Sequence, residues 1–238
     1  MLDMIYGGCN MRNLAIIPAR SGSKGLIHKN IMNLDGMPLL GYSVIAAKKS
    51  GLFDKVMVST DSEEYAAVAR KCGAEVPFLR SEKNSTDTAG SWDVVEEVLD
   101  CYMAQGIEFD NVCLLQPTSP MRTAEDIIGA YQLFLQKDAT AVISVCEAEH
   151  PPLWSGHLGE ENSLDGFLQR SSNRGRQSYG AYYRLNGALF FVKVPELRKD
   201  HFLYREGCYA YVMSREHSVD IDSIMDFRYA EFLMKYEK

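Results

Sequence analysis

Residues 14–25 read Leu-Ala-Ile-Ile-Pro-Ala-Arg-Ser-Gly-Ser-Lys-Gly, and Lys29-Asn30 follow shortly after them. The apolar run at 14–17 predicts a short buried strand. This strand leads directly into a loop with two glycines and three cations, Arg20, Lys24 and Lys29. Glycines let backbone N–H groups approach an anion closely, and the cations supply full positive charges. The stretch therefore predicts a strand followed by a loop that binds a polyphosphate.

This loop matches neither of the two common nucleotide-binding loops. A Walker loop has Lys-Ser or Lys-Thr after its second glycine, and a dinucleotide loop has three spaced glycines and no cations. Three cations instead suit the charge that shifts during phosphoryl-type transfer. The simpler alternative is an exposed basic loop, but the spacing after an apolar strand favours a functional site.

The composition limits the class of protein. The chain has 238 residues, 46% of them hydrophobic, which is enough for a substantial core. Its formal net charge of −7 argues against nucleic-acid binding and requires phosphate binding to be local. The six cysteines are scattered without a C-x-x-C pair, which indicates reduced core residues. Neither a signal peptide nor a membrane-spanning run is visible, so we expect a cytoplasmic protein.

Strand-like and helix-like segments alternate along the chain. The predicted strands are residues 14–17, 55–59, 76–79, 111–116, 139–146, 187–194 and 209–213. The predicted helices are residues 40–50, 63–72, 91–102, 123–136 and 224–236. This alternation predicts an α/β fold, with a Rossmann-like, mostly parallel sheet and helices on both faces.

The alternation breaks after Cys146. Residues 147–186 contain prolines, glycines, arginines and aromatic residues without a helical period. A disordered loop is one interpretation, but the aromatic content argues against it. We expect an inserted antiparallel arm at 147–186, and a catalytic core formed by 11–146 and 187–238.

Polar residues follow several of the predicted strands. Arg20 follows the first, Asp61 the next, Gln116 another, and Asp220 and Asp222 lie near the last. Ligands of open parallel sheets bind beyond the carboxyl ends of the strands. We therefore expect these side chains to line one pocket, although polar residues are also common in ordinary loops.

Asp220-Ile221-Asp222 is the second informative feature. On an extended segment, residues two apart share a face, so the carboxylates point together while Ile221 faces the core. Two close carboxylates repel each other unless a cation lies between them, and Mg²⁺ prefers such oxygen ligands. The alternative is a pair of acids in a solvated turn that caps the following helix. Beside a phosphate-binding loop, we favour Asp220 and Asp222 as metal ligands.

Taken in order, these motifs resemble the acylneuraminate cytidylyltransferases, the CMP-sialic acid synthetases. The resemblance runs from Leu14 to the C-terminus. Besides the first loop it includes Pro38-Leu-Leu-Gly-Tyr-Ser43, Val56-Met-Val-Ser-Thr-Asp61, Gly73-Ala-Glu-Val-Pro-Phe-Leu-Arg80, Leu115-Gln-Pro-Thr-Ser-Pro-Met-Arg122, Asn186-Gly187 and Ser218-Val-Asp-Ile-Asp222. It implies transfer of CMP from CTP to the anomeric hydroxyl of N-acetylneuraminic acid or a close nine-carbon relative, with release of pyrophosphate. It also implies Mg²⁺ as cofactor and a homodimer in which the arm completes the neighbouring site.

Three sets of site residues follow from the loop chemistry and from the resemblance. The catalytic set is Arg20, Lys24, Lys29 and Asp222. The nucleotide-binding set is Ala19, Arg20, Ser23, Lys24, Asn30, Arg80 and Ser91. The sugar-binding set is Gln116, Thr118, Arg176, Asn186, Phe190 and Tyr204, with Arg176 holding the sugar carboxylate across the dimer interface.

Structural roles are the alternative for some of these residues. Arg80 is equally compatible with a surface ion pair, Ser91 with a helix cap, and Phe190 and Tyr204 with plain packing. The chain also departs from the family pattern: Trp154 replaces a lysine beside the sugar, and Ile27 replaces a loop proline. The first departure leaves the exact sugar open.

Other functions compete with this one. The most similar alternative function is that of a cytidylyltransferase for legionaminic acid. A cytidylyltransferase for pseudaminic or deoxy-octulosonic acid agrees less well with the Gln116 motif. A glycosyltransferase also uses an Asp-x-Asp metal motif, but it has no leaving pyrophosphate to neutralise with three cations. A regulator without catalysis is the third, although both carboxylates and all three cations are present.

Overall fold

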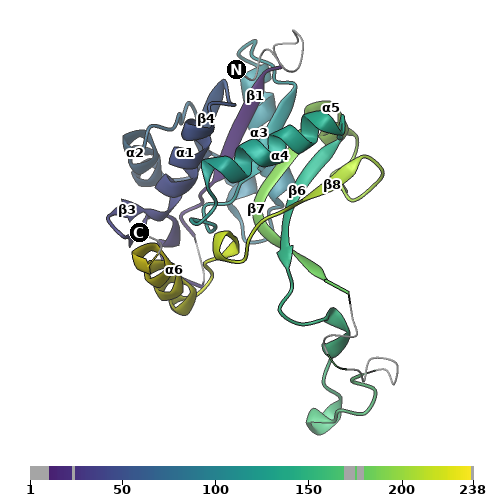
Figure 1. The fold of residues 1–238 in the computed structure, drawn as a ribbon. Coiled ribbons are helices and arrows are strands. Elements are labelled where there is room, and N and C mark those ends of the chain that lie inside the picture. The colour runs from purple at the N-terminus through teal and green to yellow at the C-terminus, as the bar shows by residue number, and fades with distance from the viewer. Residues whose placement is uncertain (1–10, 23–24, 169–174, 176–179, 237–238) are drawn as a thin grey trace.

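The computed structural model describes residues 11–22, 25–168, 175 and 180–236 (Figure 1). Its centre is a six-stranded sheet in the order β4-β1-β5-β7-β6-β8. The strands are β1 (Asn13–Pro18), β4 (Lys55–Ser59), β5 (Asn111–Leu115), β6 (Ala141–Glu147), β7 (Tyr183–Lys193) and β8 (Cys208–Val212). Only β7 runs antiparallel to its two neighbours, whereas the other three pairings are parallel. The predicted α/β fold with a mostly parallel sheet is confirmed.

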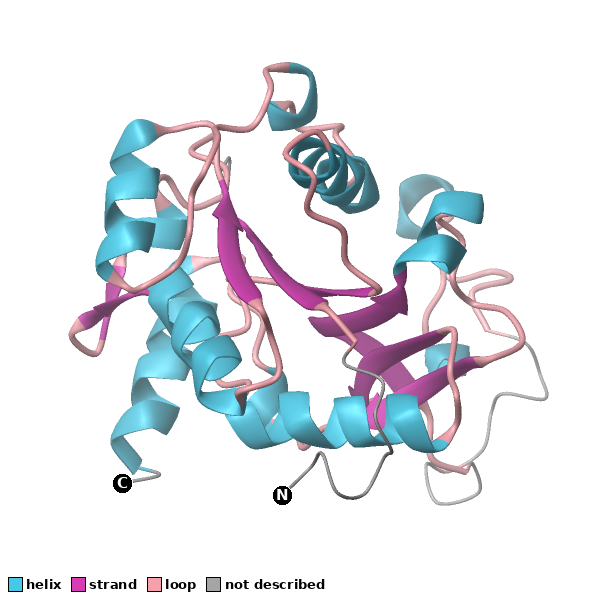
Figure 2. Ribbon diagram, turned by 90° about the horizontal axis from the view of Figure 1, so that it is seen from above, coloured by secondary structure: helices cyan, strands magenta, loops and turns pink. Residues whose placement is uncertain are grey.

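Helices cover both faces of this sheet (Figure 2). On one face lie α1 (Leu39–Ser50), α2 (Glu63–Lys71) and α4 (Ala124–Gln136), and on the other lie α3 (Ser91–Met103) and the short α5 (Val194–Lys199). Successive strand residues point to opposite faces, so β1 contributes Ala15 and Ile17 to the first core and Leu14 and Ile16 to the second. The continuous apolar character of β1 is thus the signature of a strand buried on both faces.

In a third apolar cluster, the last helix of the chain packs against residues near its N-terminal end. Helix α6 (Ile224–Tyr236) packs through Phe227 and Ala230 against Leu34 and Leu39, beside the small hairpin of β2 (Asn33–Leu34) and β3 (Met37–Pro38). Ile221, just before α6, is fully buried in the same cluster. This packing places the predicted metal ligands beside the first loop.

Local capping fixes where α4 begins. The Thr123 hydroxyl accepts a hydrogen bond from the Asp126 backbone N–H at 3.1 Å, and the Asp126 carboxylate accepts one from the Thr123 backbone N–H at 2.9 Å. This reciprocal pair is a capping box, so the helix start predicted at Thr123 is confirmed.

The predicted strand at 76–79 is wrong. Pairing in this region is limited to a bridge between Met57 and Glu75, whose backbone N–H donates to the Val56 carbonyl oxygen at 2.8 Å. Pro77 has no backbone N–H and cannot donate to a ladder. The apolar residues in this range suggested a strand, but they belong to a loop and pack from it.

Between β6 and β7, the described segment 148–168 projects from the body of the molecule (Figure 1). At its base the segment is antiparallel, because the β6–β7 ladder continues to the pair Glu147–Tyr183. The described residues beyond this base contain only the short 3-10 turns Pro152–Trp154 and Glu160–Asn162. The expected antiparallel pairing is therefore seen at the root of the arm, and the division into core and arm stays a prediction.

Two further expectations concern thiols and membranes. The five cysteines in the described part are free thiols, and Cys113 and Cys146 are fully buried. Among the helices of the described residues, none is both long and apolar enough to cross a membrane.

Candidate active site

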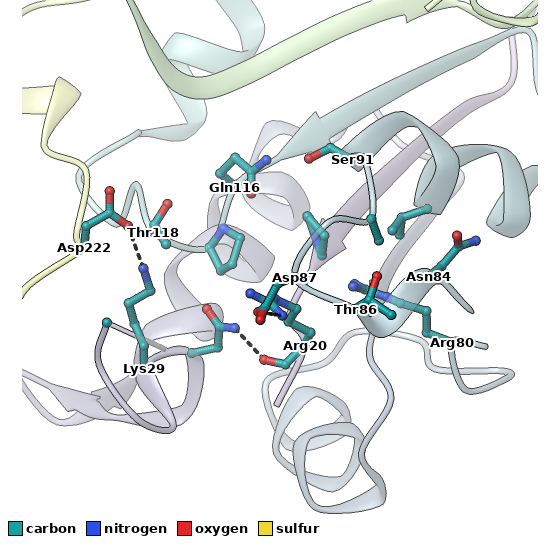
Figure 3. A pocket seen from close by; sticks show the side chains of 16 residues that line it. Arg20, Lys29, Arg80, Asn84, Thr86, Asp87, Ser91, Gln116, Thr118 and Asp222 are labelled. Carbon is teal, nitrogen blue, oxygen red and sulfur yellow. Dashed lines mark hydrogen bonds and ion pairs between the residues drawn. The ribbon is translucent and has the colours of Figure 1, made fainter. Parts of the chain in front are cut away.

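A pocket of about 540 Å³ opens beyond the carboxyl ends of β1 and β5 (Figure 3). Its lining brings together eight of the predicted site residues: Arg20, Lys29, Asn30, Arg80, Ser91, Gln116, Thr118 and Asp222. They come from the first loop, the segment before α3, the end of β5 and the segment before α6, which are far apart in the sequence. This is the position at which open α/β sheets bind their ligands.

The loop after β1 is fastened to the end of β4. The Asp61 carboxylate accepts hydrogen bonds from the Ser21 backbone N–H at 2.8 Å and from the Ser21 hydroxyl at 2.9 Å. Arg20 then crosses the pocket to form an ion pair with Asp87, with 2.6 Å between Nη1 and Oδ1 (Figure 3). The predicted residues Ser23 and Lys24 lie outside the described residues.

Asn30 supplies an unsatisfied acceptor to the pocket wall. Its Nδ2 donates to the Arg20 carbonyl oxygen at 3.1 Å, whereas its Oδ1 is buried and has no hydrogen-bond partner among the described residues. A buried acceptor without a partner costs free energy. The arrangement favours a ligand that donates a hydrogen bond at this point.

Arg80 is held at the back of the pocket by Ser59. Its Nε donates to the Ser59 hydroxyl at 3.0 Å and its Nη2 to the Ser59 carbonyl oxygen at 2.6 Å. Burial lowers the pKa of Arg80 to about 10, although Asp61 and Glu97 act in the opposite direction. The side chain therefore stays positively charged at neutral pH and is not the surface ion-pair residue considered above.

The segment between Arg80 and α3 contributes three polar lining residues that sequence reasoning missed. These are Asn84, Thr86 and Asp87 (Figure 3). The available signal was the polar run at 83–88, which reads Lys-Asn-Ser-Thr-Asp-Thr, but such runs are ordinary in loops.

Lys29 connects the first loop to the segment before α6. The side chain is largely buried, and its Nζ donates to the Ile221 carbonyl oxygen at 2.7 Å and to Asp222 Oδ1 at 2.9 Å. Asp222 itself is exposed and points toward the pocket (Figure 3). The ammonium group thus fixes the backbone and one carboxylate oxygen of the predicted metal-binding segment.

The carboxylates of Asp220 and Asp222 supply oxygen ligands of the kind that Mg²⁺ prefers. Burial raises the pKa of Asp220; a hydrogen bond from Thr118 lowers it, and the nearby charge of Asp222 raises it again. The described residues hold no group of three or more His, Cys, Asp or Glu side chains suited to a metal ion. Two carboxylates suit a Mg²⁺ ion that takes its remaining ligands from water and substrate phosphates. The residues therefore fit a metal that arrives with the nucleotide.

The floor of the pocket at Gln116 rests on a buried arginine that sequence reasoning did not place in the site. Arg122 donates to the carbonyl oxygens of Ala188 and Gln116 and to the Ser43 hydroxyl. Burial lowers its pKa to about 10. The signal was the last residue of the motif Leu115-Gln-Pro-Thr-Ser-Pro-Met-Arg122.

Comparison with known proteins adds the family to this geometry. The sequence pattern of the family described as "Cytidylyltransferase" matches residues 14–236. A pseudaminic acid cytidylyltransferase of Campylobacter jejuni is 34% identical over 94% of this chain and 97% of its own length. The chain belongs to the cytidylyltransferase family.

Other relatives of this cytidylyltransferase are named for different sugars. The N-acylneuraminate cytidylyltransferase of Escherichia coli O18:K1:H7 is 40% identical over 91% of this chain, which spans about half (51%) of that protein. The CMP-N,N'-diacetyllegionaminic acid synthase of Legionella pneumophila is 34% identical over 94% of this chain and 97% of its own length. The resemblance to acylneuraminate cytidylyltransferases is thereby confirmed, and the chain is a nucleotidyltransferase.

A solved structure shows the same fold. CMP:2-keto-3-deoxy-manno-octonic acid synthetase in complex with CTP superposes with a TM-score of 0.70, covering 95% of this chain and 100% of that chain, at 15% sequence identity. At that identity the match supports the architecture alone.

The remaining predicted residues of this cytidylyltransferase lie outside the pocket lining. Asn186 is buried, and its amide accepts from Ser144 and donates to Ser218. Phe190 packs edge-on against Trp92, with 5.8 Å between ring centroids. Tyr204 is half exposed and lines a separate groove over β6 and β8.

Two more predicted residues adjoin the pocket without being part of its lining. Ala19 is buried, and its backbone N–H donates to the Ser59 carbonyl oxygen at 2.9 Å. Asp220 lies on the segment before α6, beside Thr118. Arg176 is outside the described residues, so its assignment to the sugar stays a prediction.

Proposed function

We propose that this cytidylyltransferase transfers CMP from CTP to the anomeric hydroxyl of a nine-carbon acid sugar and releases pyrophosphate. The observation that carries the proposal is the single pocket at the strand ends that Arg20, Lys29, Arg80 and Asp222 all line. Three cations and a carboxylate suit a triphosphate with a divalent cation, because positioning and charge neutralisation supply most of the catalysis in such transfers.

The nucleotide occupies the half of the pocket formed by Arg20, Asn30, Arg80 and Ser91. When the nucleotide binds, Arg20 leaves its contact with Asp87 and stabilises the phosphates. Lys24 and Lys29 add to the positive field. Asn30 Oδ1 takes the role of a hydrogen-bond acceptor for the nucleotide, since no donor among the described residues satisfies it. Discrimination between bases requires such paired donors and acceptors.

Asp220 and Asp222 hold Mg²⁺ in this proposal. The ion, when bound, neutralises the charge that builds up on the leaving pyrophosphate. Lys29 holds Asp222 by one oxygen at 2.9 Å and leaves the rest of the exposed carboxylate available for a metal.

The acid sugar occupies the half of the pocket formed by Gln116 and Thr118, with Arg176 from the arm of a partner subunit on its carboxylate. An arginine suits bidentate capture of a carboxylate. We expect a homodimer by light scattering, and Arg176→Ala should raise the KM for the sugar more than the KM for CTP. A larger effect on CTP, or an active monomer, would contradict this part of the proposal.

N-acetylneuraminic acid is the preferred acceptor in this proposal, with legionaminic acid next and pseudaminic or deoxy-octulosonic acid after it. The relatives bear names for sialic, legionaminic and pseudaminic acids. Free thiols in the described part of the chain suit work in a reducing cytoplasm.

Pyrophosphate release tests the proposal directly. The purified protein is given each of the four nucleoside triphosphates with Mg²⁺, against N-acetylneuraminic, legionaminic, pseudaminic and deoxy-octulosonic acids. Release with CTP and one acid is the expected result and identifies the acceptor. If folded protein releases no pyrophosphate with any of these acids, the proposal is overturned and a glycosyltransferase that uses the Asp-x-Asp segment is favoured.

A further inference from the structure

We infer that Arg122 is a positioning residue that fixes the Gln116–Thr118 segment and thereby sets the affinity of the pocket for the acid sugar. The inference rests on the proposed function, because it assigns this segment to the acceptor half of the pocket. It concerns a side chain beneath the lining and not in it, since Gln116, Pro117 and Thr118 line the pocket while Arg122 does not.

The guanidinium group of Arg122 joins three elements. Nη1 donates to the Ala188 carbonyl oxygen in β7 at 2.6 Å and to the Gln116 carbonyl oxygen after β5 at 3.3 Å. Nη2 donates to the Ser43 hydroxyl in α1 at 2.6 Å. A planar fork reaches acceptors in several directions at once, which a lysine ammonium on a flexible stem does less well.

Ser43 closes this network. While its oxygen accepts from Arg122, its hydroxyl donates to the Gln116 carbonyl oxygen at 3.1 Å. The Gln116 backbone is therefore held from two sides, by a charged donor and by a hydroxyl that the same charge orients. Ser43 is fully buried and does not line the pocket, so its effect on a ligand has to pass through this network.

The arrangement is costly for the free protein. Arg122 is only 2% exposed, its three acceptors are neutral oxygens, and its Nε is buried without a hydrogen-bond partner among the described residues, although the charge of Asp126 favours the charged guanidinium. Burying a charge without a paired opposite charge is unfavourable, and natural proteins tolerate such features mainly at functional sites. The cost is explained if the buried charge holds the pocket floor in the shape that an anionic sugar requires.

The nucleotide half has separate supports. Arg80 is held by Ser59 and the first loop by Asp61, and neither set of contacts includes Arg122 or Ser43. A change at Arg122 should therefore act on the two substrates unequally. This inequality separates a positioning role from general damage to the fold.

The test measures KM for CTP and for the acid sugar in Arg122→Lys and Ser43→Ala. Arg122→Lys should raise the sugar KM about tenfold or more, on the order of losing a buried charged hydrogen bond. Ser43→Ala should raise it about threefold, because it removes one neutral contact. The KM for CTP, and CTP binding measured by calorimetry, should change less than about twofold, since the nucleotide contacts are separate.

Two matched variants serve as controls. Ser50→Ala removes another buried hydroxyl of α1, but its hydrogen bond to the Ala47 carbonyl oxygen stays within the helix. Arg198→Lys changes an arginine that pairs with Glu96 and Asp100 away from the pocket. Neither control should shift either KM.

The outcomes separate the inference from the proposed function. The inference is overturned if both KM values rise equally, or if the sugar KM rises in neither Arg122→Lys nor Ser43→Ala. In either case the proposed function stands as long as the wild-type protein turns over the substrates. If Arg122→Lys does not fold, Ser43→Ala against Ser50→Ala decides. Wild-type protein that turns over none of the acids overturns the proposed function and this inference together.

Discussion

Lys29 Nζ lies 2.9 Å from Asp222 Oδ1, joining two residues that are 193 positions apart in the chain. The same ammonium group donates to the Ile221 carbonyl oxygen at 2.7 Å. The lysine side chain is 11% exposed, whereas that of Asp222 is 79% exposed. The buried cation therefore holds an accessible carboxylate at the pocket rim. The first loop and the segment before α6 thus form one site.

Replacing Asp222 should abolish most of the activity. We expect Asp222→Ala to lower turnover about a hundredfold or more, the order of loss for a charge-stabilising group. Asp222→Asn keeps an acceptor for Lys29 but removes the charge, so it should lose nearly as much. Turnover measured by pyrophosphate release, with circular dichroism to verify the fold, checks this expectation.

The control for Asp222 is Asp138→Asn. Asp138 is also an exposed carboxylate paired with a lysine, Lys193, at 2.6 Å, but it lies outside the pocket lining. Its variant should keep wild-type turnover. Near-normal turnover in folded Asp222→Ala would falsify the metal assignment.

The ion pair between Arg20 and Asp87 predicts competition with the nucleotide. Both side chains are about a third exposed, at 29% and 37%, and such pairs contribute about 0.2–1 kcal/mol. If the phosphates replace Asp87 at Arg20, Asp87→Asn removes that competition. Calorimetry without the acceptor sugar should show CTP binding up to about fivefold tighter. Tenfold weaker binding would instead mean that Asp87 contacts the nucleotide complex.

Glu97 in α3 holds the segment that carries Asn84, Thr86 and Asp87. Its carboxylate accepts from the Ser81 backbone N–H at 2.7 Å, from the Ser81 hydroxyl at 2.8 Å and from the Asn84 amide. Burial acts to raise the pKa of Glu97, but the hydrogen bonds from Ser81 and Asn84 outweigh it and hold the pKa below the usual 4.5. The ionised carboxylate is therefore stabilised in the folded protein.

This shift predicts a pH-dependent contribution to stability. The unfolded chain takes up the proton near the usual pKa and the folded protein only at lower pH, so the stabilisation is complete above pH 4.5 and is lost as the pH falls through the folded-state value. The difference in free energy of unfolding between wild type and Glu97→Gln, from urea titrations at several pH values, should shrink over that window. Glu108→Gln, at an exposed loop position, is the control for the substitution itself.

The sequence predicted the sheet well because the deciding information is local. The apolar run at 14–17 and the capping residues at Thr123 and Asp126 determine elements through their own spacing and hydrogen bonds. The position of the site then followed from the general rule that open sheets bind ligands at the carboxyl ends of their strands. This rule placed Arg20 and Gln116 at one pocket. Such features need no knowledge of distant contacts.

The features that the sequence did not predict concern contacts that only the folded chain defines. Asn186 sits in a motif but turns its amide to Ser144 and Ser218, because the register of β6 against β7 brings these partners together. Arg122 resembles a surface arginine in sequence, yet the fold buries it beneath Gln116. No local pattern distinguishes these orientations.

Gly25 gives a prediction with a control in the same loop. A Cβ atom at position 25 would lie 2.9 Å from the Asp222 carbonyl oxygen, too close for either backbone to stay in place. A Cβ at Gly22 would meet, among the described residues, nothing nearer than Arg20 Nη1 at 4.0 Å. Gly25→Ala should therefore push the first loop away from the carboxylate segment and lower turnover about tenfold to a hundredfold. Gly22→Ala should lower turnover less than Gly25→Ala does, because its Cβ meets no backbone atom among the described residues.

Thermal unfolding separates this effect on the site from damage to the fold. Gly25 is exposed and lies outside the apolar clusters, so both alanine variants should unfold at nearly the same temperature as wild type. A larger loss of turnover in Gly25→Ala than in Gly22→Ala, at unchanged unfolding temperature, is the expected result. Equal turnover in the two variants would mean that the close approach of Gly25 to Asp222 is not required, and the contact between Lys29 and Asp222 would then suffice to align the two segments.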